Sequence, residues 1–106
     1  MEDTLSRTII EELSSELKSK YPDFRGIYLF GSRARGDFNE ESDYDLAIIF
    51  DNQINWKFED EISSMIWLKM IKYEIIIDSF VYNLNDILNP ITPVRENINK
   101  EGVYFG

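Results

Sequence analysis

The feature that most constrains the fold is a polar stretch, from Gly31 to Asp45, that separates two short apolar runs. The runs cover residues 27–30 and 46–50, and each is wholly apolar, as buried β-strands are. Small residues lie at one end of the polar stretch and paired carboxylates lie at the other. The sequence therefore predicts a strand, a loop and a second strand, in which the loop carries the polar chemistry.

The first end of the stretch, Gly31 and Ser32, has the composition of an anion site. Glycine has no Cβ and serine has only a short hydroxyl, so backbone N–H groups can approach a phosphate closely. A helical turn with Ser32 as its N-cap would direct further N–H groups toward the same anion. Arg33 and Arg35 add positive charge nearby. An ordinary turn is the alternative interpretation of Gly-Ser taken alone.

Asp43 and Asp45 form the other end of the stretch. They are two residues apart where the second strand begins, so both side chains leave the same face and can bind a hard cation together. Two carboxylates held so close repel each other, and a divalent cation of the Mg²⁺ type relieves that repulsion. The structural alternative is that Asp43 closes the loop and Asp45 is a solvated residue of a half-exposed strand.

Gly-Ser, ten further residues and then Asp-Tyr-Asp running into an apolar strand resemble the signature of the minimal nucleotidyltransferases of the DNA polymerase beta-like superfamily. The resemblance implies that Gly31, Ser32 and Arg33 hold the triphosphate of a nucleotide, with ATP as the substrate. It also implies that Asp43 and Asp45 bind two Mg²⁺ ions for nucleotidyl transfer. A third carboxylate on a later strand would complete the site.

Asp78 is the candidate for that third catalytic and metal-binding carboxylate. It lies within residues 73–82, whose β-branched and aromatic content predicts a strand with Ile76 and Phe80 on the same face as Asp78. A lone ionised carboxylate among apolar neighbours is costly to bury, so Asp78 reaches a cation, finds hydrogen-bond donors or lies on an open face. In the first case it could also accept the proton of an attacking hydroxyl.

Apolar patterning outside these segments predicts two helices, over residues 3–20 and 56–71, and Pro93 at a first helical position with Gly102 as the end predicts a third, over residues 93–100. Asp3 or Thr4 can cap the first helix, and Thr92 can cap the third. Residues 103–105 are expected to form a last extended segment. These elements predict one domain, residues 1–106, of the α/β (α+β) class: a small mixed β-sheet with helices packed against it, which is also the fold that the resemblance implies.

The helix over residues 56–71 has a wider apolar face than one buried stripe requires, because Trp67, Met70 and Ile71 extend it. Core packing accounts for most of this face. The sharper hypothesis is a contact with a partner protein or with another copy of the chain, which would make a homo-oligomer.

Composition limits the chemistry and the partners. The chain contains no cysteine and no histidine, so it has no disulfide, no thiol nucleophile and no Ser-His triad. A formal net charge of −9, from 20 acidic and 11 basic residues, argues against a long nucleic acid as substrate. No run approaches the length of a membrane span and no leader segment is recognisable, so a cytoplasmic protein that does not bind membranes is expected.

The resemblance makes two-metal phosphoryl transfer the leading hypothesis, with AMP moved from ATP to an acceptor hydroxyl. Short relatives in the resembled family are often paired with helical HEPN-type toxins, and some transfer AMP to a tyrosine of that toxin, so such a partner is implied for this chain. A binding module that neutralises its partner by contact, with weak or absent catalysis, is the alternative. An acidic cation-binding protein without a nucleotide is a third interpretation.

Overall fold

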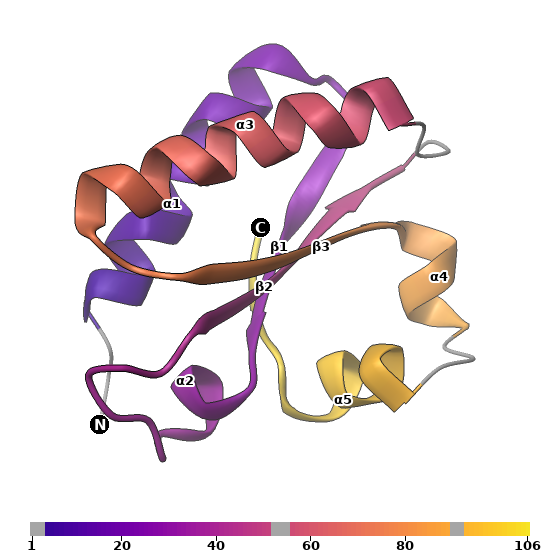
Figure 1. Ribbon diagram of the computed structural model, residues 1–106. Coiled ribbons are helices and arrows are strands. Elements are labelled where there is room, and N and C mark those ends of the chain that lie inside the picture. Colours follow the sequence, from indigo (N-terminus) through magenta and orange to yellow (C-terminus); the bar gives the residue numbers. More distant parts are fainter. Residues whose placement is uncertain (1–3, 52–55, 90–92) are drawn as a thin grey trace.

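A computed structural model describes residues 4–51, 56–89 and 93–106 and shows a four-stranded sheet with helices on both faces (Figure 1). The elements along the chain are α1 (Thr4–Lys20), β1 (Phe24–Phe30), α2 (Ser32–Arg35), β2 (Tyr44–Phe50), α3 (Trp56–Tyr73), β3 (Ile77–Asn83), α4 (Leu84–Leu88), α5 (Pro93–Glu101) and β4 (Val103–Phe105). This arrangement confirms the predicted mixed sheet with packed helices.

The sheet has the strand order β3-β2-β1-β4. β1 pairs antiparallel with both β2 and β4, whereas β2 and β3 are parallel. A parallel pair requires a crossover connection, which α3 supplies on the way from β2 to β3. The strand order places β3 at one edge of the sheet, and in Figure 1 β3 lies in front of the other strands.

Apolar side chains form a core on each face of the sheet. The larger cluster joins the sheet to α1 and α3, and the smaller one joins it to α4 and α5. β2 contributes to both, because alternate residues such as Ile48 and Ile49 point to opposite faces and both are buried. The only residue of β2 that is not buried is Asp45. A central strand held on both faces thus positions one acidic residue.

Most of the predicted elements are confirmed, with differences at their ends. The first two strands begin earlier than expected, at Phe24 and Tyr44. The prediction that strand 73–82 begins at Tyr73 is wrong, because α3 continues to Tyr73 and β3 begins at Ile77. α4 was not predicted. The proposed caps Asp3 and Thr92 lie outside the described residues.

The extra apolar residues of α3 only partly enter the core. Trp67, Leu68 and Ile71 are 57 to 64% exposed, whereas Met70 packs against the larger cluster. Within the described residues, no helix has the length and hydropathy needed to cross a bilayer.

Candidate active site

Asp45 and Asp78 lie directly opposite each other on the two parallel strands. The register pairs Asp45 of β2 with Asp78 of β3, and the N–H of Tyr44 donates a 2.9 Å hydrogen bond to the C=O of Ile76. Adjacent strands are about 4.8 Å apart, so the two carboxyl groups share one face at one strand spacing. Asp43 is exposed and immediately precedes β2. The fold therefore brings the three predicted carboxylates to one end of the β2–β3 pair.

The charges at this end act on Asp45. Burial raises the pKa of Asp45 above its ordinary value, and the negative charges of Asp78, Asp43 and Glu101 raise it further. The positive charge of Arg35 acts in the opposite direction. A nearby cation would therefore stabilise the ionised form of Asp45, which both its burial and its neighbours disfavour.

Gly31 is positioned against Asp45 by a conformation that favours glycine. Its φ angle is +73°, and a Cβ added there would collide with the Asp45 carboxylate. The Gly31 C=O accepts 3.1 Å hydrogen bonds from the N–H groups of Ala34 and Arg35, which starts the one-turn helix α2. Gly31, and not Ser32, is the N-cap, so the predicted capping role of Ser32 is wrong, although the helical turn itself is confirmed.

Arg33 is buried and holds the loop between α2 and β2. Its Nη2 donates to the C=O of Ser42 at 3.0 Å, and its guanidinium lies 4.1 Å from the ring centre of Tyr44 and 4.5 Å from that of Phe38. These contacts tie α2 to the start of β2, and so to Asp43 and Asp45. The Arg33 side chain is directed into this loop, and its predicted contact with a nucleotide stays a prediction.

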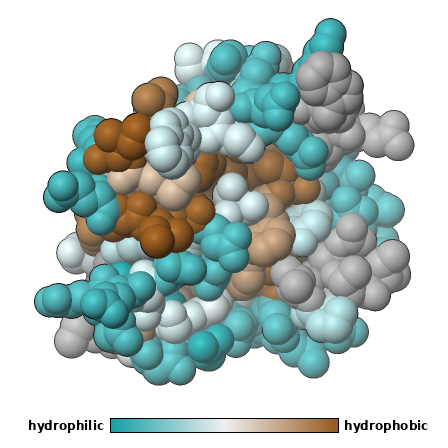
Figure 2. Space-filling model, in the orientation of Figure 1, coloured by the Kyte–Doolittle hydropathy of each residue, from teal (hydrophilic) through white to brown (hydrophobic). Residues whose placement is uncertain are grey.

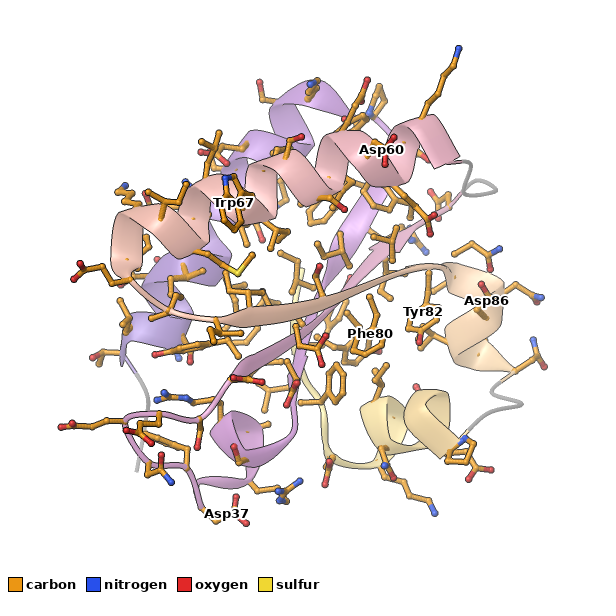
Figure 3. The ribbon with its side chains drawn as sticks, in the orientation of Figure 1. Asp37, Asp60, Trp67, Phe80, Tyr82 and Asp86 are labelled. Atoms are coloured by element: carbon orange, nitrogen blue, oxygen red, sulfur yellow. The ribbon has the colours of Figure 1, made fainter. Side chains whose placement is uncertain are left out.

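Arg35 is the exposed arginine of the site, with 46% of its side chain accessible. Its Nη1 lies 3.1 Å from Glu101 of α5, and its Nε lies 3.3 Å from Asp37, which Figure 3 labels below α2. The motif places both arginines near the anion end without distinguishing them. What distinguishes them is the pair of rings, Phe38 and Tyr44, that encloses Arg33.

The donor set suits a hard divalent cation. Asp43, Asp45 and Asp78 offer only carboxylate oxygens, which are the ligands that Mg²⁺ prefers, and a cation there would offset the charges that raise the Asp45 pKa. In the described portion of the chain, no three carboxylates are yet gathered tightly enough to hold an ion as they stand.

Comparison with known proteins supplies independent evidence. A family profile described as polymerase beta nucleotidyltransferase matches residues 11–104. A Methanocaldococcus jannaschii protein provisionally named a protein adenylyltransferase is 38% identical over 73 residues, which make up 68% of each chain. The protein adenylyltransferase MntA of Aphanizomenon flos-aquae is 43% identical over 44 residues, which are 42% of this chain and 29% of MntA.

A solved structure shows the same architecture. The crystal structure of a toxin–antitoxin with AMP-PNP superimposes with a TM-score of 0.65 at 20% identity, over 92% of this chain and 69% of the other. At this identity the likeness concerns the fold, which is a mixed sheet with a glycine turn before an acidic strand in the chain described above.

Proposed function

The chain belongs to the polymerase beta nucleotidyltransferase family, and on that premise we propose that it transfers AMP from ATP to a hydroxyl group of a protein acceptor. The observation that best supports this proposal is the register that sets Asp78 opposite Asp45. The two residues come from separate strands, and core packing gives no reason to place two carboxylates side by side. Nucleotidyl transfer would explain why the two carboxylates lie side by side.

The anion end would hold the nucleotide triphosphate. Gly31 lets the backbone approach a phosphate closely. Ser32 begins α2, whose first N–H groups have no partner within the helix. Arg35 is the accessible cation beside them and would exchange its contacts with Asp37 and Glu101 for phosphate oxygens. The role of Arg33 would be to keep the loop and the aspartates in place.

The carboxylate end would hold two Mg²⁺ ions, with Asp43, Asp45 and Asp78 as ligands. Bound there, the ions would neutralise charge on the α-phosphate and on the leaving pyrophosphate. Asp78 would accept the proton of the attacking hydroxyl, whose oxygen forms the new bond to the α-phosphorus as the bond to pyrophosphate breaks. The protein contributes positioning and electrostatics, not a covalent intermediate.

The acceptor that we favour is a tyrosine of a HEPN-type toxin. Two of the similar proteins are named for protein adenylylation, and the similar crystal structure is a toxin–antitoxin with AMP-PNP. An acidic chain of net charge −9 would also suit a basic protein partner.

The proposal is tested by incubating the protein with ATP, Mg²⁺ and the product of the adjacent gene, and weighing every species by mass spectrometry. We expect a product heavier by one AMP, and we expect Asp78→Asn to lower the rate by about 10³-fold or more. Asp51→Asn is a matched control, because Asp51 follows the other end of β2 and pairs with Arg25 at the surface. A stable complex without an AMP adduct would instead support the contact-only binding module.

A further inference from the structure

The outer edge of β3 borders a groove that the proposed chemistry does not use. The groove has a volume of about 430 Å³ and lies between β3 and the first half of α3. Its lining residues, which we call the edge groove, are Glu59, Asp60, Ser63, Ser79, Phe80, Val81 and Tyr82. Among the described strands, β3 pairs only with β2.

The backbone of β3 presents hydrogen-bonding groups to this groove. Alternate residues of a parallel strand direct N–H and C=O toward the same neighbour. Because the C=O of Ile76 accepts from β2, the polar groups of Asp78 and Phe80 face β2 as well. Those of Ser79 and Val81 therefore point outward, and no described residue bonds to them. Such an edge is a template for one more strand.

The two sides of the edge groove differ in chemistry. Glu59 and Asp60 place carboxylates on the α3 side, and neither forms an ion pair with any described residue. On the other side, the rings of Phe80 and Tyr82 are stacked with centres 6.2 Å apart. Figure 3 shows Asp60 on one side of β3 and the two rings on the other, and Figure 2 shows hydrophobic side chains across the middle of this face. Basic residues of a ligand would therefore suit the α3 side, and apolar residues would suit the side with the two rings.

The edge groove is continuous with the candidate active site. Asp78 directly precedes Ser79, and its side chain shares a face with Phe80. A strand added to β3 would lie one spacing of about 4.8 Å away, so a residue on that same face could reach Asp78. One extended segment could thus bind the groove and present its hydroxyl to the site.

We propose that the edge groove binds an extended, basic segment of the acceptor protein as a fifth strand beside β3, with the acceptor hydroxyl toward Asp78. This inference rests on the proposed function, because it assigns the binding site of that reaction's acceptor. A second copy of this chain fits the groove less well, since it would bring its own Glu59 and Asp60 against the same charges.

The test uses a synthetic peptide of about nine residues in which lysine alternates with valine around one tyrosine at a valine position. In a strand, the lysines then face α3 while the valines and the tyrosine face Phe80 and Asp78. We expect the peptide to bind, measured by fluorescence anisotropy, and to become adenylylated. A peptide with glutamate in place of lysine should bind at least about tenfold more weakly.

Variants of the protein test whether the peptide binds at the outer edge of β3. Val81→Pro removes one outward N–H and leaves the bonds to β2, so binding should fall about tenfold or more, whereas Val81→Ala should stay within about threefold. Asp60→Lys should weaken binding similarly, and Glu11→Lys, the same charge change on α1, should not. In the wild-type protein, hydrogen exchange at Ser79 and Val81 should slow when peptide is added, which tests the proposal even if Val81→Pro does not fold.

Unchanged binding by Val81→Pro and Asp60→Lys, equal binding of the glutamate peptide, or unchanged exchange at Ser79 and Val81 would overturn the inference. So would a wild-type dimer in sedimentation that Val81→Pro converts to a monomer, because a second copy would then occupy the edge. Calorimetric titration with Mg²⁺ and ATP, without peptide, tests the proposed function separately. Peptide binding without nucleotide binding would contradict the proposed function, whereas the proposal that the edge groove binds an extended segment would still hold.

Discussion

Arg33 and Arg35 lie two residues apart in the same helical turn, yet they have opposite surroundings. Arg33 is buried against two rings and the loop carbonyls, and Arg35 is exposed between Asp37 and Glu101. Side-chain contacts across the loop, not position in the motif, decide which arginine is available to a ligand. The two substitutions should therefore have different effects.

We expect Arg35→Gln to raise the KM for ATP by about tenfold, because the site loses its accessible cation, while thermal stability changes little. Arg33→Gln should instead lower the melting temperature by several degrees, about 4–8 °C, since buried bonds to Ser42 are lost. Steady-state kinetics and calorimetry on both variants measure the difference. An unchanged KM for Arg35→Gln would contradict the phosphate-binding role.

Asp45→Asn should separate activity from stability. Burial and the charges of Asp78 and Asp43 raise the Asp45 pKa, so the folded protein disfavours its ionised form at neutral pH. An uncharged amide removes that repulsion, and in EDTA we expect the melting temperature to rise by about 2–4 °C. AMP transfer should be abolished. A lower melting temperature in EDTA would mean that the carboxylate stabilises the fold.

The sequence placed Asp45 and Asp78 on strands because their flanking residues are apolar, β-branched or aromatic, but the register that sets the two opposite each other came only from the structure. Sequence did not locate the end of α3. The helix continues to Tyr73 and stops at Glu74, whose φ of +54° is the left-handed conformation that usually marks a glycine. Because no glycine marks the end of the helix, the β-branched run that follows predicts a strand that begins too early, at Tyr73.

The missed helix α4 did carry a signal. Asn83 accepts a hydrogen bond from the N–H of Asp86, and the Asp86 carboxylate accepts one from the N–H of Asn83, which is a capping box. The many turn-forming residues after position 83 concealed this pattern. Sequence could therefore have located the start of α4, but its five-residue length depends on packing of Ile87 in the smaller core cluster.

Helices α1 and α3 are joined by ion pairs that should respond to pH. Glu12 accepts a 2.6 Å hydrogen bond from Lys72 and also contacts Lys69 and Tyr73. The bond from Lys72 is the largest cause of a lowered Glu12 pKa, and attraction to Lys69 adds to it. Because the folded-state pKa is below the unfolded value, this stabilisation is complete at neutral pH and is lost as the pH falls through the lowered pKa.

We therefore expect Glu12→Gln to lower the melting temperature at pH 7 and to resemble the wild type at a pH below the lowered Glu12 pKa, where the wild-type carboxylate is protonated. Thermal unfolding followed by circular dichroism at the two pH values measures both differences. Glu11→Gln is the control, since Glu11 is the exposed neighbour of Glu12 on α1. A difference that persists at low pH would show that charge is not the cause.

At the scale of the whole molecule, we expect the carboxylates of Asp43, Asp45 and Asp78, at one end of the β2–β3 pair, to bind Mg²⁺ together with its nucleotide. A ligand at about 100 times its Kd stabilises a folded protein by about 2.7 kcal/mol. Mg²⁺ with ATP should thus raise the melting temperature by about 10 °C. Asp45→Asn should remove most of this rise, and an equal rise from ATP in EDTA would contradict a metal-dependent site.

The parallel pairing of β2 and β3 also has a consequence for protein synthesis. Asp43 and Asp45 leave the ribosome early, but their partner on β3 is made only after the whole of α3 has been translated. A nascent chain therefore carries Asp43 and Asp45 without Asp78 until the crossover helix and β3 have been translated. Because the proposed transfer uses all three carboxylates, we expect unfinished polypeptides neither to consume ATP nor to modify a neighbouring protein, so that translation itself delays the onset of activity.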